Sequence, residues 1–156
     1  YGTTIDKVSG GSGPSTNYSE VGTYKVEGQS LRLFTQSIDA NGVCWVQVDV
    51  PYGKKLRRVY TGLKRFDDAT SMIPLFDEGD YDEFAKAKVL KTVKALYGPG
   101  DGYDTYGGLT VDKGMTVSVV YTENGYAQVE FEAFSSKLNK RQMYRCWVSE
   151  KVLKLK

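Results

Sequence analysis

Histidine is absent from the 156 residues of this chain, and its absence removes two common kinds of functional site. Histidine is the side chain that enzymes most often use as a general base, and it is the commonest metal ligand. A serine or cysteine nucleophile needs such a base, and carboxylate pairs on a surface this rich in charge arise by chance. The glycine-rich run 98–102 lacks the lysine and hydroxyl of a phosphate-binding loop. We therefore predict a protein that is not an enzyme, with no catalytic residue, no cofactor and no metal site.

Cysteine is scarce, and long apolar runs are missing. Cys44 and Cys146 cannot form the disulfide framework of a small secreted domain. Each shares strand parity with nearby valines, so both are expected to be free thiols that face a core. No run approaches the roughly 20 apolar residues of a transmembrane helix, and no signal-peptide pattern opens the chain. Because the first residue is Tyr1, we expect a piece of a longer protein, for which a missing signal says nothing about export.

Net charge is also small, and the distribution of charge is more informative than the total. The formal charge of +2 does not argue for a nucleic-acid partner. Segment 54–65 contains basic residues and no acid, segment 67–83 contains acids and no base, and segment 137–156 is basic again. The near-neutral total therefore hides three alternating blocks.

What the chain does contain is an internal repeat with an offset of roughly 81–86 residues. A Gly-Pro turn followed by a tyrosine occurs in 12–18 and again in 97–103. An Asn-Gly pair occurs at 41–42 and at 124–125, where we predict two-residue hairpin turns with positive φ at both positions. The apolar and polar residues that follow each pair alternate with the period of a half-buried strand. Each half therefore predicts a small antiparallel barrel.

The connector between the halves has a different composition. In 80–88 the acids come first and the lysines last, an order that predicts one or two turns of helix. The preceding segment 72–76 is too apolar for a free linker, so we expect it to pack on the folded part of the chain. The acidic run 77–83 also invites a calcium interpretation, but its spacing does not fit an EF-hand loop, and a helix start explains the acids more simply.

The second half, from about 89 to 153, resembles a bacterial SH3-type domain. The resemblance rests on 97–100 with Tyr103, on 111–114, on 123–131, and on 147–148 with 151–153. The first half is similar but more divergent, with matches at 13–14, Gly28 and 45–48. Gly62 precedes a leucine where the family usually has an aromatic residue, and Cys146 occupies the family's glycine position.

The resemblance implies an all-β fold of two small SH3-like five-stranded barrels in tandem. The barrels would span 1–70 and 89–156, with an acidic, partly helical linker over 71–88. Such domains occur in exported bacterial proteins, often beside cell-wall hydrolases, where they bind peptidoglycan or peptides. An extracellular or cell-envelope location is therefore implied as well.

Aromatic residues recur at matching places in both halves and are the first candidates for ligand contact. Flat rings stack on sugars or prolines at a low cost in rotamer freedom. The same rings also suit packing against a cross-strand neighbour, so both roles stay open for each of them. The candidate ligand-binding residues are Tyr97, Tyr103, Tyr106, Tyr126, Trp147, Tyr18 and Trp45.

Two basic turns at matching places form the second candidate surface. Clustered cations would attract an anionic polymer or lipid. A docking site for the acidic linker is another option, but we favour solvated turns that protect a sheet edge. The residues of this basic patch are Lys54, Lys55, Arg57, Arg58, Lys137, Lys140 and Arg141.

The function that these features favour is a non-catalytic binding module of an exported bacterial protein. Its expected partner is cell-wall peptidoglycan or a peptide, recognised through aromatic surface residues, with no nucleic acid and no membrane span. The alternative is a structural spacer or protein–protein interaction pair without affinity for the wall. The oligomeric state is open.

Overall fold

The computed structural model describes residues 1–66, 73–76 and 84–156. The described part is all-β, with two short 3-10 turns, η1 (Leu63–Arg65) and η3 (Glu150–Val152). This confirms the predicted all-β class. The strands are β1 (Gly2–Thr3), β2 (Val8–Gly11), β3 (Glu20–Tyr24), β4 (Ser30–Leu31), β5 (Leu33–Ile38), β6 (Cys44–Tyr52), β7 (Lys55–Gly62), β8 (Ala85–Val89), β9 (Val93–Leu96), β10 (Thr105–Val111), β11 (Thr116–Glu123), β12 (Tyr126–Ser135), β13 (Lys140–Ser149) and β14 (Leu153–Leu155).

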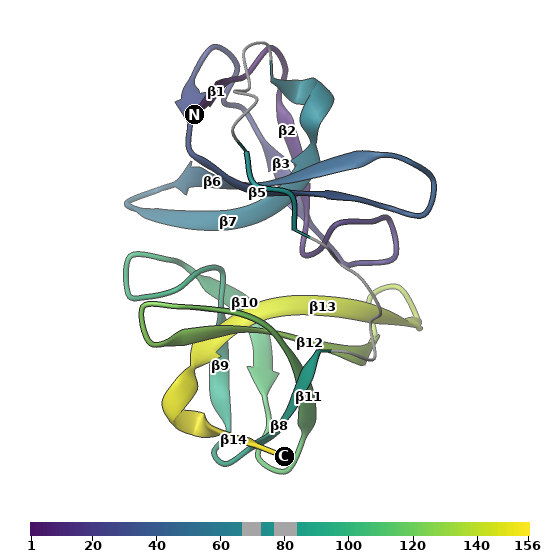
Figure 1. The fold of residues 1–156 in the computed structure, drawn as a ribbon, viewed down its shortest axis with the longest axis vertical. Helices are drawn as coiled ribbons and strands as arrows, with labels where there is room; N and C mark the ends of the chain where they lie inside the picture. The colour runs from purple at the N-terminus through teal and green to yellow at the C-terminus, as the bar shows by residue number, and fades with distance from the viewer. Residues whose placement is uncertain (67–72, 77–83) are drawn as a thin grey trace. The chain divides into compact units, whose positions relative to one another are not determined.

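The strands form three antiparallel sheets (Figure 1). Strands β1 and β4 pair alone, and a five-stranded sheet has the order β3-β2-β7-β6-β5. A seven-stranded sheet has the order β10-β9-β13-β12-β11-β8-β14. The chain divides into two compact units. The first unit contains Tyr1–Pro51 and Arg58–Gly79, and the second unit contains Tyr52–Arg57 and Asp80–Lys156.

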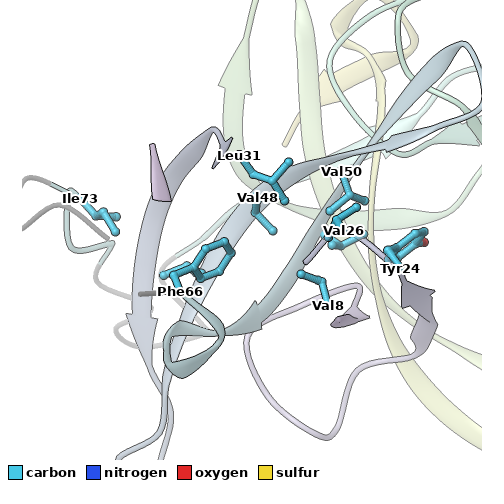
Figure 2. Close-up of a cluster of buried hydrophobic side chains, with 10 residues drawn as sticks. Val8, Tyr24, Val26, Leu31, Val48, Val50, Phe66 and Ile73 are labelled. Carbon is cyan, nitrogen blue, oxygen red and sulfur yellow. The ribbon is translucent and has the colours of Figure 1, made fainter. Parts of the chain in front are cut away.

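Each unit has its own hydrophobic core, built from the period-2 pattern of its strands. In β6 the side chains of Val46, Val48 and Val50 are fully buried, and they alternate with polar residues. They pack in the first unit with other buried side chains, including Phe66. Figure 2 labels Val48, Val50 and Phe66 in this cluster. The buried members of the second core are Ala87, Val89, Ala95, Val111, Val117, Ala127, Val129, Phe131, Cys146 and Val148.

The helix predicted over 80–88 is wrong for its last part, because Ala85–Val89 forms strand β8. Ala87 and Val89 are buried and alternate with Lys86 and Lys88, so burial at period 2 overrides the helix-like order of charges. The remainder of that prediction, and the acidic run 77–83, lie outside the described residues.

The apolar segment before the acidic run packs on the first unit, as predicted for residues 73–76. The Ile73 side chain is buried in the first core. The Gln36 backbone N–H donates to the Pro74 carbonyl at 2.9 Å, and the Phe76 N–H donates to the Gln36 carbonyl at 2.8 Å. This segment therefore adds backbone pairing to β5.

The two Asn-Gly turns differ from each other. Asn124 and Gly125 have φ of 55° and 82°, as predicted for a two-residue hairpin turn. At the first pair only Gly42 has positive φ, at 80°. The prediction for Asn41 is wrong because the hairpin is longer there and closes through the Asp39 N–H, which donates to the Val43 carbonyl at 3.0 Å.

Candidate ligand-binding site

A cavity of about 240 Å³ lies in the first unit, between β2, β3, the loop that joins them and the start of β6. Tyr18 comes from the loop and Trp45 comes from β6, and both rings line the cavity. Both rings are half-buried. Two of the seven aromatic candidates therefore meet at one hollow.

Tyr18 is held in place by a glycine and by the closure of its loop. A Cβ at Gly13 would lie only 2.2 Å from Cδ2 of Tyr18, so the ring lies directly against a position that must lack a side chain. The Ser12 N–H donates to the Ser19 carbonyl at 2.9 Å, and the two serine hydroxyls are 2.8 Å apart. The loop can therefore present the tyrosine at a fixed place.

Trp45 is held by the longer hairpin that precedes it. Its Nε1–H donates to Oδ2 of Asp39 at 2.9 Å, while Oδ1 of Asp39 accepts from the N–H groups of Asn41 and Val43. The bond from Trp45 and the backbone N–H groups of the turn hold the pKa of the Asp39 carboxyl below its ordinary value. A carboxylate that stays ionised thus fixes the indole by its edge.

Glycines and hydroxyl groups form much of the remaining wall. Gly10 pairs with Gly22 across β2 and β3, and the register shifts between Gly10 and Gly11. Gly22 has φ of +130°, a conformation that side-chain-bearing residues rarely adopt. The backbone here is open to close approach by a ligand. The hydroxyl groups around it belong to Ser9, Ser15, Thr16 and Thr23.

The charge of the cavity is set by one carboxylate. Among the described residues that line the cavity, Glu20 is the one charged residue, and none is a lysine or an arginine. Aromatic rings, hydroxyls and accessible backbone suit polar ligands that carry apolar faces, such as sugars and peptides. The Glu20 carboxylate repels anionic ligands and favours cationic or neutral ones.

In the second unit three of the aromatic candidates, Tyr97, Tyr106 and Trp147, pack against other aromatic rings. Tyr97 is buried and stacks on Tyr106 with ring centroids 4.5 Å apart. Trp147 is only 2% exposed and meets the edge of Tyr121. The prediction of surface contact is therefore corrected for Tyr97 and Trp147, whose rings serve as packing.

The other two candidates of the second unit, Tyr103 and Tyr126, are half-buried. Tyr103 lies against Gly98, where a Cβ would come within 2.0 Å of its ring. Neither tyrosine lines the cavity that holds Tyr18 and Trp45.

The basic patch does not form one solvated surface. Arg58 is buried and its Nε donates to Oδ1 of Asp49 at 3.0 Å, so its prediction as a surface cation is wrong. Within the second unit Arg57 pairs with Asp104 at 2.8 Å, and its guanidinium lies 3.6 Å from the ring centroid of Tyr52. The exposed members of the patch are Lys54, Lys55, Lys137, Lys140 and Arg141, of which Arg141 pairs with Glu132.

The two thiols are free, as predicted, but they differ in burial. Cys146 belongs to the second core, and burial raises the pKa of its thiol far above the ordinary value. Cys44 is only half-buried, so the prediction that it faces a core is wrong. Its Sγ–H donates to Oε1 of Gln36 at 3.3 Å, and partial desolvation raises the pKa of this thiol too.

The sequence analysis missed Asp39, which holds Trp45 from outside the cavity, and Glu20, which lines the cavity. Asp39 lies two residues before Asn41, and an aspartate at the start of such a turn is a signal for side-chain bonds to the following N–H groups. Glu20 gave no signal, because its role follows from the place of β3 beside β2.

In the part of the chain that the structure describes, no group of three or more acidic or cysteine side chains could hold a metal ion. No helix among the described residues is long and apolar enough to cross a membrane.

No family model matches the chain, and no match is found among curated proteins or solved structures. The geometry of the cavity therefore carries the functional argument.

Proposed function

We propose that this chain is a non-catalytic binding module of an exported bacterial protein, formed by two SH3-like barrels. The first unit would bind a peptidoglycan fragment or a peptide in the cavity between Tyr18 and Trp45. The observation that carries this proposal is the meeting of the two rings at one cavity. Each ring is held in place by a neighbouring residue: Tyr18 lies against Gly13, and Trp45 donates to the Asp39 carboxylate.

The chemistry of the wall favours this ligand class. A sugar ring or a peptide plane offers an apolar face to the two aromatic rings and polar edges to the hydroxyl groups. The rings are held before a ligand arrives, so little conformational entropy is lost on binding. Glu20 would further favour a ligand that carries an amino group, such as the free amine of a wall peptide.

The packing in the second unit favours a second candidate function for that part of the chain. Tyr97 and Trp147, which would form an aromatic groove if they were exposed, are buried. A structural spacer or protein-interaction role without wall affinity fits a unit whose rings are used for its own stability.

The test is co-sedimentation of the purified chain with intact bacterial sacculi at low and high salt. We expect retention that survives high salt, because ring stacking is screened little by ions whereas contacts of exposed lysines are screened strongly. The substitution W45A should reduce retention about tenfold or more, as expected for a tryptophan at the centre of a binding site.

The matched control is F134A, which removes an aromatic ring that is 58% exposed and lies outside the cavity. Retention of this variant should equal that of the unchanged chain. Absence of retention at both salt concentrations would favour the spacer function. Equal losses in W45A and F134A would reject the cavity as the binding site.

A further inference from the structure

Four lysines lie opposite one another at one edge of the seven-stranded sheet. Lys88 of β8 is the direct cross-strand partner of Lys154 of β14. One step along the same pair of strands, the Lys156 N–H donates to the Lys86 carbonyl at 3.0 Å. Figure 1 shows β14 beside β8 at this edge. We call these four residues the lysine ladder: Lys86, Lys88, Lys154 and Lys156.

The ladder lies on the face of β8 that points away from the core. Ala87 and Val89 are buried in the second core, so the alternating Lys86 and Lys88 lie on the opposite face. Neighbouring strands are about 4.8 Å apart, and residues two apart along a strand are about 6.7 Å apart. The four lysine side chains are therefore attached to closely spaced backbone positions, in a grid of two rows on two strands.

The neighbouring strand β11 places two hydroxyl-bearing residues beside this grid. Thr116 of β11 is the cross-strand partner of Lys88, and Ser118 is the partner of Lys86. The Lys86 Nζ donates to the Ser118 Oγ at 2.7 Å. Thr116 and Ser118 thus continue the two rows of the ladder with neutral polar groups.

The acids one strand farther away are already engaged by arginines. Glu130 accepts from Nε of Arg145 at 2.6 Å, and Glu132 accepts from Nε of Arg141 at 2.5 Å. Lys88, Lys154 and Lys156 form no ion pair with any described residue. Like charges that face each other across strands destabilise a sheet. Among the described residues, Lys88, Lys154 and Lys156 thus concentrate positive charge at this edge, at a cost in stability.

Protection of the sheet edge does not explain the whole ladder. Lysine on an edge strand prevents pairing with another chain, and β14 is such a strand. Strand β8, however, is paired on both sides, with β11 and with β14. Its lysines therefore add repulsion without adding protection.

We propose that the lysine ladder binds a linear polymer of repeating phosphate groups. Such a polymer presents anionic oxygens at short intervals and can lie along two rows of ammonium groups. The hydroxyl of Thr116, which is exposed, donates a further hydrogen bond to a phosphate oxygen. A lipid surface fits less well, because Leu155, which is exposed, lies in register with Ala87 and not with the lysines.

The test uses the whole chain with inorganic polyphosphate as the probe, titrated at several salt concentrations. For three to four lysine contacts we expect log K to fall against log salt with a slope of about −2 to −3. The charge reversal K88E/K154E should abolish measurable binding. The control K25E/K64E changes net charge equally, at exposed lysines of the first unit, and should bind as the unchanged chain does.

A second readout separates binding from folding. The single variant K154E places a glutamate opposite Lys88, so its Tm should rise by about 1–5 °C while its affinity for polyphosphate falls. A higher Tm with unchanged affinity would overturn the proposal and leave edge protection as the role of the ladder. Equal losses in both double variants would also overturn it.

Two comparison probes test the class of ligand. Vesicles that contain phosphatidylglycerol should bind more weakly than polyphosphate of equal charge. An oligothymidylate should not exceed polyphosphate in affinity, because the proposed contacts are to phosphate alone. Preference for either the vesicles or the oligonucleotide would overturn the proposal.

Discussion

The two units close an equivalent loop with the same backbone contacts, but the side chains beside the loop differ between them. In the first unit the Ser12 N–H donates to the Ser19 carbonyl at 2.9 Å, and in the second the Tyr97 N–H donates to the Asp104 carbonyl at 2.9 Å. In both, a tyrosine ring lies against the glycine of the Gly-Pro pair. The repeat in the sequence is therefore also a repeat of backbone contacts.

The side chains at the ends of this loop explain why one unit has the better-defined cavity. Ser12 and Ser19 are small and bond to each other through their hydroxyls. At the matching positions of the second unit, Tyr97 stacks on Tyr106, and Asp104 binds Arg57. The repeated sequence pattern thus predicts where this loop lies in each unit. The residues at the two ends of the loop, small in the first unit and large in the second, decide whether the nearby rings line a cavity or pack on each other.

A buried ion pair is also repeated, and breaking it should give the largest effect. Arg145 and Glu130 have side chains only 1% and 0% exposed, whereas Asp49, the partner of Arg58, is 10% exposed. The substitution R145M leaves a buried carboxylate without its cation and should lower the free energy of unfolding by about 3–5 kcal/mol. R58M should cost about 1–3 kcal/mol, because water reaches the carboxylate left behind.

Each unit contains one of the two tryptophans, so urea unfolding can be followed separately. Fluorescence of Trp147 in a W45F background reports the second unit, and fluorescence of Trp45 in a W147F background reports the first. The double substitution E130L/R145M should recover part of the loss, because it removes both charges. Equal costs for R145M and R58M would contradict the difference in burial.

Substitution of Gly13 and Gly98, which lie against the two loop tyrosines, should lower stability by an intermediate amount in each unit. G13A and G98A each force a ring away from a new Cβ, so each should cost about 1–3 kcal/mol in its own unit. Retention on sacculi should fall only for G13A, because Tyr18 lines the cavity. In the controls G62A and G102A the new Cβ meets only an ordinary contact with Lys64 at Gly62 and nothing within 4 Å at Gly102, so stability should change by less than about 0.5 kcal/mol. Loss of retention in G98A would place the binding site in the second unit.

The sequence predicted strands from alternating apolar and polar residues, as in β6 with Val46 and Val48. It missed β8, because four alternating residues after an acidic run also fit a helix. It named Tyr18 and Trp45 as ligand residues, but their meeting depends on strand neighbours that are distant in sequence. The burial of Arg58 was missed for a different reason: it was grouped with the neighbouring basic residues of a turn, whereas it pairs with Asp49 on the preceding strand.

The smallest predicted effect concerns the carboxylate that fixes Trp45. The pKa of Asp39 is lowered in the folded chain, chiefly by the hydrogen bond from Trp45. An acid of this kind stabilises the fold at pH above its unfolded pKa, and the stabilisation is lost as pH falls through the folded pKa. Fluorescence of Trp45, in a W147F background, should therefore stay constant from pH 7 to about 4 and change only below about pH 3.9, the ordinary aspartate value.

The variant D39N provides the control for this titration. Its amide oxygen can still accept from the indole N–H, so the ring should remain near its place, but the side chain no longer titrates. The low-pH change assigned to Asp39 should then disappear, although other acids still titrate in that range. A fluorescence change above pH 4, or one that persists unaltered in D39N, would show that the hairpin carboxylate does not hold Trp45. The second unit turns at Asn124-Gly125 without such a loop, so this form of pH dependence should be confined to the first unit.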